Sequence, residues 1–195
     1  MSNLDEVDCA VNTLFNSGNT EIVLLHCVSE YPADAKHVNL KAMQTLSSTF
    51  GLPVGFSDHT QGIDIPIAAV ALGACVIEKH FTIDKSMEGP DHAASLEPEE
   101  FHNMVTGIRK VEAALGNGVK KPTINELNNM KVVRKSLVAS SDLSAGTILQ
   151  RSMIAIKRPG TGLPPFAIDS IIGRELQTSI QAGCPFTLEM FKCEQ

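Results

Sequence analysis

The chain has 195 residues, of which 43% are hydrophobic and 19% are charged, and its formal net charge is −6. These values describe an ordinary globular protein of one or two small domains, and the lack of a basic stripe argues against a nucleic-acid partner. No apolar run reaches the length of a membrane helix and the polar, acidic N-terminus is not a signal peptide, so we expect no membrane partner and a cytoplasmic location.

The cysteines also favour a reducing compartment. Five of them are scattered along the chain without a CxxC pair: Cys9, Cys27, Cys75, Cys184 and Cys193. An odd, dispersed set is typical of free thiols rather than of a disulfide framework. Cys27 and Cys75 fall in apolar runs, so we expect both thiols to be buried.

The chain begins with the pattern of a helix, a strand and a second helix. Asn3 and Glu6 form a capping-box pattern that opens an amphipathic helix, and Gly18 ends it. The continuous apolar run 22–25 is typical of a strand buried on both faces. Apolar residues at helical spacing within 39–51 predict the next helix.

Two further strands are expected to bring two histidines together. The apolar runs 53–54 and 75–77 predict these strands, and the apolar segment 65–72 predicts a helix between them. A strand–helix–strand order makes the strands parallel with a right-handed crossover. His59 and His80 then lie at the carboxyl ends of neighbouring strands, the edge where α/β proteins bind ligands. Both imidazoles could reach one metal ion or one anionic substrate; the alternative is two unrelated polar residues at strand ends.

After the third strand the sequence predicts a long loop and a long helix. The loop, 82–95, is polar and long for a connection from strand to helix, which suggests a functional loop. Pro98 suits the first turn of the following helix. The expected buried stripe of that helix is Phe101, Val105, Ile108, Val111 and Leu115. Repeated strand–helix units predict a parallel sheet with helices outside it.

From about residue 120 the character of the sequence changes. Residues 121–133 read as a hydrophilic linker with a short helix at 124–130, and short β-type runs begin after Arg134. The segment 142–146, Asp-Leu-Ser-Ala-Gly, returns 37 positions later as Ser-Ile-Gln-Ala-Gly at 179–183. We therefore expect a compact second domain that contains two similar turn-then-strand units.

Five motifs, in this order, resemble one enzyme family. They are His26-Cys27-x-x-x-Tyr31-Pro32, Ser57-Asp58-His59, Glu78-Lys79-His80-Phe81, Gly89-Pro90-Asp91 and Lys157-Arg158-Pro159-Gly160-x-Gly162. The family is that of the sialic acid synthases, which includes N-acetylneuraminate, legionaminate and pseudaminate synthases. Its fold is a TIM barrel followed by a small antifreeze-like (SAF) domain.

The resemblance implies an α/β fold and a division of the chain. Residues 1–120 would be three βα units of an incomplete (β/α)8 TIM barrel, corresponding to its sixth to eighth strands, with the first five absent. Residues 121–133 would be a linker, and residues 134–195 a β-rich SAF domain. The full-length family protein is expected to be a domain-swapped homodimer.

The resemblance also assigns roles to individual residues. His59 and His80 would hold Mn²⁺ or Mg²⁺, with two structural histidines as the alternative, and Asp58 would orient one imidazole. Further residues would meet the substrates or complete the catalytic site: Ser29 and Ser57 at phosphoenolpyruvate, Tyr31 and Asp91 at the sugar, and Arg158 reaching the sugar site from the other subunit. The alternatives are a capping or solvated Asp91, a buried Tyr31 with a satisfied hydroxyl, and a surface Arg158.

The family condenses phosphoenolpyruvate with N-acetylmannosamine or a related acetamido sugar to a nonulosonic acid and releases phosphate. Asp91 and Arg158 are the catalytic-site residues expected from this chain, whereas the family's catalytic Glu and phosphate-holding Lys residues come from earlier strands. We therefore expect an N-acetylneuraminate synthase-type chain that is inactive alone. Legionaminate or pseudaminate synthase is the alternative within the class, and a non-catalytic remnant or assembly module is the alternative outside it.

Overall fold

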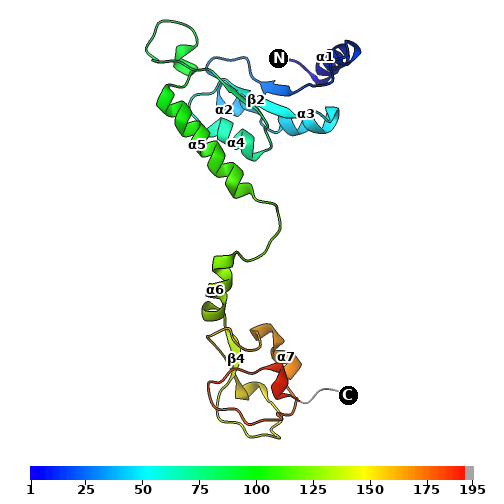
Figure 1. The fold of residues 1–195 in the computed structure, drawn as a ribbon, viewed down its shortest axis with the longest axis vertical. Coiled ribbons are helices and arrows are strands. Elements are labelled where there is room, and N and C mark those ends of the chain that lie inside the picture. The colour runs from blue at the N-terminus through cyan, green and yellow to red at the C-terminus, as the bar shows by residue number, and fades with distance from the viewer. Residues whose placement is uncertain (192–195) are drawn as a thin grey trace. The chain divides into compact units, whose positions relative to one another are not determined.

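The computed structural model describes residues 1–191, which divide into two compact units, Met1–Val119 and a second unit that starts at Lys120 (Figure 1). Cys193 and the last residues of the predicted 134–195 domain lie outside the described residues. Within residues 1–191 there is no helix long and apolar enough to cross a membrane.

The first helix, α1 (Leu4–Asn16), begins where the capping box predicts. The Asn3 side chain accepts a hydrogen bond from the Glu6 amide at 2.9 Å, and the Glu6 carboxylate accepts one from the Asn3 amide at 2.7 Å. Two amides that would otherwise be unpaired at the start of the helix are satisfied in this way.

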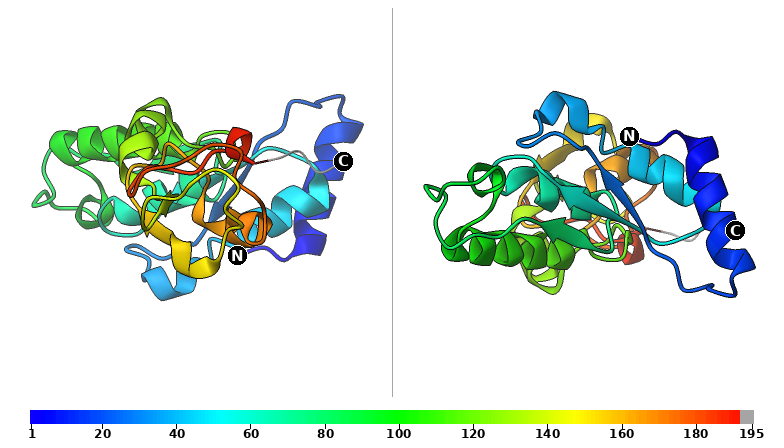
Figure 2. Two further views of the ribbon diagram at one scale, coloured as in Figure 1. Left: turned by 90° about the horizontal axis from the view of Figure 1, so that it is seen from below. Right: turned by 90° about the horizontal axis from the view of Figure 1, so that it is seen from above.

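The three strands of the first unit form one parallel sheet in the order β1-β2-β3 (Figure 2). They are β1 (Leu24–Cys27), β2 (Val54–Asp58) and β3 (Ile77–Lys79). The parallel arrangement confirms the prediction, but β1 and β3 begin two residues after the apolar runs do. The pairing of Leu24 with Val54 explains this for β1, because a strand starts where its partner offers hydrogen bonds.

The expected burial of Cys27 and Cys75 is wrong for Cys75. Cys27 lies inside β1 and is half-buried, whereas Cys75 is exposed. Cys75 donates its amide to the Val54 carbonyl at 2.9 Å but precedes β3, so it lies at the entrance of the strand rather than within it.

Helices pack on one face of the sheet, and apolar side chains fill the space between the helices and the strands. Val54 and Phe56 of β2 are buried in a cluster with Val38, Met43 and Ala69. A second cluster joins the last two helices of the unit through Val70, Leu96, Met104 and Ile108. The helices are α2 (Ala35–Val38), α3 (Ala42–Phe50), α4 (Asp64–Ala71) and α5 (Pro98–Leu115).

The predicted buried stripe of α5 is only partly correct. Val105 is 36% exposed and Leu115 is 55% exposed, while Met104, which the stripe omits, is buried. α5 has 18 residues and packs on α4, which has eight, so the shorter helix cannot cover the end of the longer one (Figure 1). The two helices approach closely at Gly107, where a Cβ would lie 2.6 Å from Ile67 Cδ1.

The opposite face of the sheet is poorly covered. A Cβ added at Gly55 would lie 2.5 Å from Leu25 Cδ2 and 2.9 Å from Val76 Cβ, so these three positions share one face. Leu25 is 37% exposed and Val76 is 42% exposed. Parallel sheets normally bury both faces, and this one buries mainly the face under the helices.

The second unit is small and built mainly from turns. It contains α6 (Ile124–Val133), the antiparallel pair β4 (Ser136–Ala139) and β5 (Ile154–Lys157), α7 (Ile168–Ile171) and the 3-10 turns η2 (Arg151–Met153), η3 (Pro165–Ala167) and η4 (Leu188–Met190). Its core is a cluster of side chains from across the unit: Leu137, Ala139, Leu143, Leu149, Ile171, Leu176, Ile180, Phe186 and Phe191.

The internal repeat appears as two equivalent turns that bond to each other. Leu143 and Ile180, which are 37 positions apart, exchange both backbone hydrogen bonds at 2.8 Å. The Gly146 amide donates to the Leu176 carbonyl, and the Gly183 amide donates to Ala139, the position 37 residues before Leu176. The unit therefore has an approximate internal two-fold relation.

Side chains of the two halves also form a reciprocal pair of hydrogen bonds. Asp142 Oδ1 accepts a hydrogen bond from the Ala182 amide at 2.7 Å, and Ser179 Oγ accepts one from the Ala145 amide at 3.1 Å. Asp142 and Ser179 occupy equivalent positions of the repeat, so each half caps the turn of the other half.

Candidate functional site

The two predicted histidines lie at the carboxyl ends of adjacent strands. His59 follows β2 and His80 follows β3. The Ala33 amide donates to the His59 carbonyl at 2.8 Å, and the Leu96 amide donates to the His80 carbonyl at 2.9 Å. The loops after β1 and β3 therefore fix the backbone of both histidines. The two imidazole centroids are 5.1 Å apart in an edge-to-face arrangement.

His59 is almost completely buried and its ring is held by one hydrogen bond. Its Nδ1 lies 2.7 Å from the Val28 carbonyl oxygen, an acceptor, so Nδ1 must carry the proton in the neutral ring. Nε2 is then left with its lone pair. The Cys27 sulfur lies 3.8 Å from the same Nδ1. This tautomer presents Nε2 as the free nitrogen, which is the form that ligates a metal.

Tyr31 lies against both imidazoles. Its ring centroid is 4.1 Å from that of His59 and 5.5 Å from that of His80. The side chain is about half exposed, so the interpretation of Tyr31 as a buried core residue is excluded.

Asp91 joins the site from the loop after β3. Its Oδ2 lies 3.8 Å from His80 Nδ1. The base of the loop is closed by a hydrogen bond from the Thr82 amide to the Leu96 carbonyl at 3.0 Å. Inside it, His92 Nδ1 lies 2.8 Å from Thr82 Oγ1. The loop is thus ordered by its own contacts, and it brings Asp91 to the edge of the histidine pair.

The expectation that Asp58 orients an imidazole is wrong. Asp58 and Lys79 form a fully buried ion pair at 2.7 Å, and Asp58 also accepts the Thr60 amide at 2.8 Å. Lys79 donates in addition to the Thr60 carbonyl. Successive strand residues alternate between faces, so Asp58 lies on the face opposite His59 and cannot reach its ring. The backbone carbonyl of Val28 takes the role expected of Asp58.

Glu78 is a site residue to which the sequence analysis assigned no role. Ser57 Oγ donates a 2.5 Å hydrogen bond to Glu78 Oε1 across the paired positions of β2 and β3. Glu78 is exposed on the poorly covered face of the sheet, the same face as His80. The position of Glu78 two residues before His80 was the available signal, because residues two apart on a strand share a face.

Two of the predicted site residues, Ser29 and Arg158, belong to other segments of the chain. Ser29 is exposed in the loop after β1. Arg158 belongs to the second unit, where its Nε donates to the Val133 carbonyl at 2.9 Å. The cluster within the first unit therefore consists of Tyr31, His59, His80 and Asp91, with Ser57 and Glu78 beside it.

Comparisons with known proteins agree with the two units. Residues 1–120 match the NeuB family, and residues 134–192 match the SAF domain. The chain belongs to the NeuB family. It is 50% identical over 187 residues to N,N'-diacetyllegionaminic acid synthase of Legionella pneumophila, covering 94% of this chain and 52% of that protein. The N,N'-diacetyllegionaminic acid synthase of Campylobacter jejuni is 51% identical over 176 residues, covering 89% of this chain and 53% of that protein.

A solved member of this group is also similar. The crystal structure of N-acetylneuraminic acid synthetase from Leptospira borgpetersenii, in complex with citrate, is 39% identical with a TM-score of 0.60. The match covers 67% of this chain and 45% of that one. The chain spans about half the length of the curated relatives it matches.

Two residues of this NeuB chain fit as ligands of one metal ion. His59 offers Nε2 with the tautomer fixed by Val28, and His80 lies beside it at the same sheet edge. Across residues 1–191, no group of three or more His, Cys, Asp and Glu side chains is placed to hold a metal. The chain thus offers two imidazoles, and a metal there would complete its shell with water, substrate or groups from other segments.

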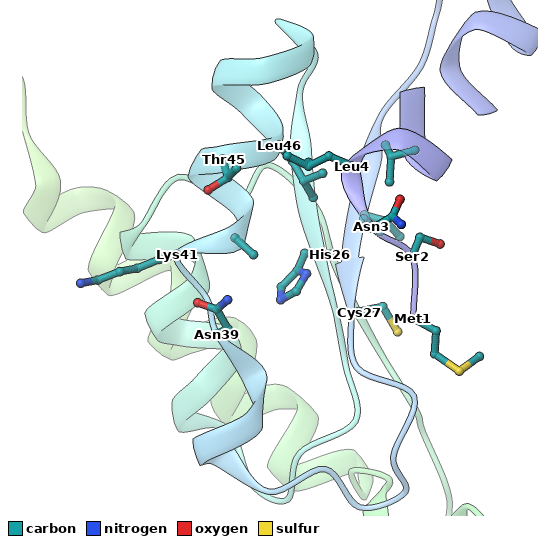
Figure 3. Close-up of a pocket in the computed structure, with 13 residues that line it drawn as sticks. Met1, Ser2, Asn3, Leu4, His26, Cys27, Asn39, Lys41, Thr45 and Leu46 are labelled. Carbon is teal, nitrogen blue, oxygen red and sulfur yellow. The ribbon is translucent and has the colours of Figure 1, made fainter. Parts of the chain in front are cut away.

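A separate cavity, the α1–β1 groove, is lined by neither His59 nor His80. This α1–β1 groove, of about 580 Å³, lies beside β1, where side chains from the start of α1, from β1 and from α3 converge (Figure 3). It is lined by Met1, Ser2, Asn3, Leu4, Val7, Leu25, His26, Cys27, Asn39, Lys41, Ala42, Thr45 and Leu46. We therefore take the histidine cluster, and not this groove, as the candidate site.

Proposed function

We propose that this chain supplies part of the active site of a nonulosonic acid synthase, and that it acts together with segments that it does not itself contain. The observation that carries the proposal is the pair of imidazoles at adjacent strand ends, with His59 held by a backbone carbonyl and Tyr31 lying against both rings. Membership of the NeuB family supports the same class of chemistry.

In the proposed reaction, carbon 3 of phosphoenolpyruvate forms a bond to the aldehyde carbon of an open-chain acetamido sugar. Water then adds to carbon 2, and the C–O bond to phosphate breaks, with the phosphate taking the bonding electrons. A Mn²⁺ or Mg²⁺ ion on His59 and His80, when bound, supplies a Lewis acid for the aldehyde oxygen.

The other residues of the cluster bind and orient the substrates. Tyr31 and Asp91 bind sugar hydroxyls, since both lie at the exposed side of the histidine pair. Ser57 turns its hydroxyl from Glu78 toward phosphoenolpyruvate, and Ser29 offers a second hydroxyl from the loop after β1. Arg158 adds a permanently charged group with several donors to the sugar site.

The sugar is proposed to carry two acetamido groups. Identity is 50% and 51% to the two N,N'-diacetyllegionaminic acid synthases and 39% to the N-acetylneuraminic acid synthetase. This difference favours a diacetyllegionaminate-type product over N-acetylneuraminate, which the motifs alone did not separate. Pseudaminate synthase remains the alternative in the same class.

The proposal includes an architecture. Residues 1–120 form three βα units of a TIM barrel, residues 121–133 link them to residues 134–195, and those residues form the SAF domain. The full assembly is a domain-swapped homodimer in the cytoplasm, in which Arg158 enters the site of the other subunit. The parallel β1-β2-β3 sheet with helices on one face supports the barrel assignment.

The test is release of phosphate from phosphoenolpyruvate in the presence of Mn²⁺ and candidate acetamido sugars. We expect no turnover by the chain alone, because loss of a general acid or base typically costs ~10²–10⁴-fold and the phosphate-holding residues are also outside this chain. The part of the Campylobacter jejuni synthase that this chain does not match is then added. The mixture should release phosphate only when an acetamido sugar is present, and the diacetamido sugar should be preferred over N-acetylmannosamine.

Two results would contradict the proposal. Robust sugar-dependent release by the chain alone would show that its residues suffice. A complex that forms but releases no phosphate with any acetamido sugar would favour the non-catalytic assembly module.

A further inference from the structure

The segment that carries Arg158 is held on one side by a single buried hydroxyl. Ser136, the first residue of β4, is completely buried. Its Oγ donates a hydrogen bond to the Pro159 carbonyl at 2.7 Å and accepts one from the Gly162 amide at 2.9 Å. A buried hydroxyl is stable only when it is hydrogen-bonded, and both of these bonds go to residues 158–162, the Arg158 loop. One side chain therefore closes this loop onto β4.

On its other side the Arg158 loop meets the end of α6. The Gly160 amide donates to the Lys131 carbonyl at 2.9 Å, and Arg158 Nε donates to the Val133 carbonyl at 2.9 Å. The last carbonyls of a helix have no partner within the helix, so the loop satisfies two of them. The positive guanidinium also lies at the negative end of the helix dipole, where a cation is favoured.

The backbone around the Arg158 loop is closely packed. A Cβ added at Gly160 would lie 2.6 Å from Arg134 Cβ, so the loop approaches the end of α6 as closely as a glycine allows. Directly after the loop, the Leu163 carbonyl accepts the Leu137 amide at 2.8 Å, and the Leu163 amide donates to the Phe186 carbonyl at 2.7 Å. The loop is therefore held at both ends and has little room to shift.

We propose that Ser136 is a positioning residue of the synthase, which holds the Arg158 loop so that the two terminal amino groups of Arg158 face one acceptor group of the sugar. Arg158 is exposed, and its Nε is already bonded to α6. The guanidinium is planar with its donors in a fixed arrangement, so a bond at Nε also sets the direction of the two terminal groups. A side chain that is fixed in advance loses less conformational freedom when it binds. This inference rests on the proposed function for the ligand of Arg158, and it adds how Arg158 is held.

The first test follows Arg158 in the chain alone. NMR measures the exchange of the Arg158 Nε proton with water, which the bond to Val133 slows. Ser136→Ala removes both bonds to the Arg158 loop and should speed this exchange by about tenfold or more. Gly160→Ala should act in the same direction without touching the hydroxyl, because its Cβ would displace the loop from Arg134. This second variant carries the test if Ser136→Ala does not fold, which circular dichroism checks.

Gly146→Ala is the matched control for stability. It lies in the same unit and strains the backbone at a φ of +85°, but an added Cβ there would meet nothing within 4 Å. It should lower the stability of the unit and leave the exchange of the Arg158 Nε proton unchanged. Unchanged exchange in the folded Ser136 and Gly160 variants would overturn the proposal. Equal acceleration by Gly146→Ala would also overturn it, because loss of stability alone would then explain the effect.

The second test uses the complex with the part of the Campylobacter jejuni synthase that this chain does not match. Ser136→Ala should raise KM for the sugar by about tenfold and change KM for phosphoenolpyruvate much less, because only the group that meets the sugar is released. Ser136→Ala should add no further loss to Arg158→Ala, since a positioning residue acts only through the group that it holds. A full, independent loss in the double variant would contradict the inference.

The outcomes separate this inference from the proposed function. Faster Nε exchange in Ser136→Ala, with no phosphate release by any complex, would establish the hold on Arg158 and contradict the proposed function. Turnover by the complex with an unchanged KM for the sugar in Ser136→Ala would overturn the inference and leave the function standing.

Discussion

At the scale of single residues, the site depends on how His59 is held. A backbone carbonyl of Val28, rather than a carboxylate, accepts the hydrogen bond that fixes its tautomer, so Nε2 is the ring nitrogen that keeps a free lone pair. The charges of Asp58 and Lys79 neutralise each other on the opposite face of the sheet. Removing one member of such a pair typically costs about 3–5 kcal/mol because the other charge is left buried, so we regard this pair as part of the scaffold.

The histidine pair gives the first prediction. The chain should bind Mn²⁺ loosely, because two protein ligands form an incomplete shell, and the double variant His59→Ala/His80→Ala should bind it roughly tenfold more weakly or not at all. Water proton relaxation during a Mn²⁺ titration measures both. His26→Ala is the control, since His26 bonds to the Val38 carbonyl and lies outside the pair. Equal binding by the parent and the double variant would exclude these ligands.

The local sequence pattern placed His59 and His80 at neighbouring strand ends, which the structure confirms. Tyr31 and Asp91 were expected from the resemblance to the synthase family, and the roles of all four residues stay predictions. Sequence reasoning failed at Asp58, whose partner depends on which face of β2 each residue occupies. The alternation along a strand was known, but the register against β3 was not, and that register pairs Asp58 with Lys79. The same reasoning assigned no role to Glu78, although the spacing of two residues between Glu78 and His80 already placed both on one face of the strand.

At the scale of elements, the loop after β3 is anchored to the start of α5 by charged groups. The Lys85 amide donates to Glu97 Oε1 at 2.9 Å, and Lys85 Nζ donates to Glu100 Oε1 at 2.5 Å. The hydrogen bond from Lys85, followed by that from the Glu97 amide, lowers the pKa of Glu100 below its ordinary value. The anchor contributes stability above the unfolded-state pKa of Glu100, and this contribution is lost as the pH falls through the lowered value.

This anchor gives the second prediction. Lys85→Met should raise the pKa of Glu100 toward its ordinary value, because the largest cause of the lowering is removed. The amide shift of Glu97, which donates to Glu100 Oε2 at 3.0 Å, reports the titration by NMR. Lys110→Met, which removes a lysine from the same helix as Glu100, is the control. An unchanged midpoint in Lys85→Met would mean that the ion pair does not form in solution.

The repeat in the second unit gives the third prediction. Gly146 and Gly183 have φ of +85° and +81°, and an added Cβ would meet nothing within 4 Å at either position. Gly146→Ala and Gly183→Ala should therefore each destabilise the unit by about 1–2 kcal/mol through backbone strain alone. Urea unfolding of a fragment 120–195, followed by circular dichroism, measures both. A large difference between the two variants would show that the halves are not equivalent.

Helices and strands were predicted well where a local sequence pattern sets their ends. They were predicted less well where packing against other elements determines burial or ends. The capping box of α1 and the apolar segment of α4 gave their helices closely. The stripe of α5 failed at Val105 and Leu115, because helical periodicity does not say how far the neighbouring helix extends. β1 begins two residues after its apolar run, because pairing rather than hydrophobicity sets where this strand begins. β3 also begins two residues after its run, although Cys75 and Val76 already bond to β2.

At the scale of the whole molecule, the first unit has a sheet with open edges and a poorly covered face. This gives the fourth prediction: residues 1–120 alone should aggregate or form oligomers, because the buried area must offset ordering costs of ~1–2 kcal/mol for each residue while strand edges stay unpaired. Sedimentation velocity and thermal unfolding of the fragment are the measurements. A compact monomer that unfolds cooperatively would contradict both this prediction and the barrel assignment.

The reciprocal turns of the second unit have a consequence for the rate at which it folds. Leu143 with Ile180, Gly146 with Leu176, and Gly183 with Ala139 are all pairs of partners 30 or more positions apart along the chain. Each turn has one local hydrogen bond, from the Thr147 amide to Ser144 and from the Cys184 amide to Gln181, but its other partners lie far along the chain. Few local contacts are therefore available to stabilise a partly formed state. A unit this rich in non-local contacts has a high contact order for its size, and it should fold in one step on the slow, millisecond-to-second side of small domains.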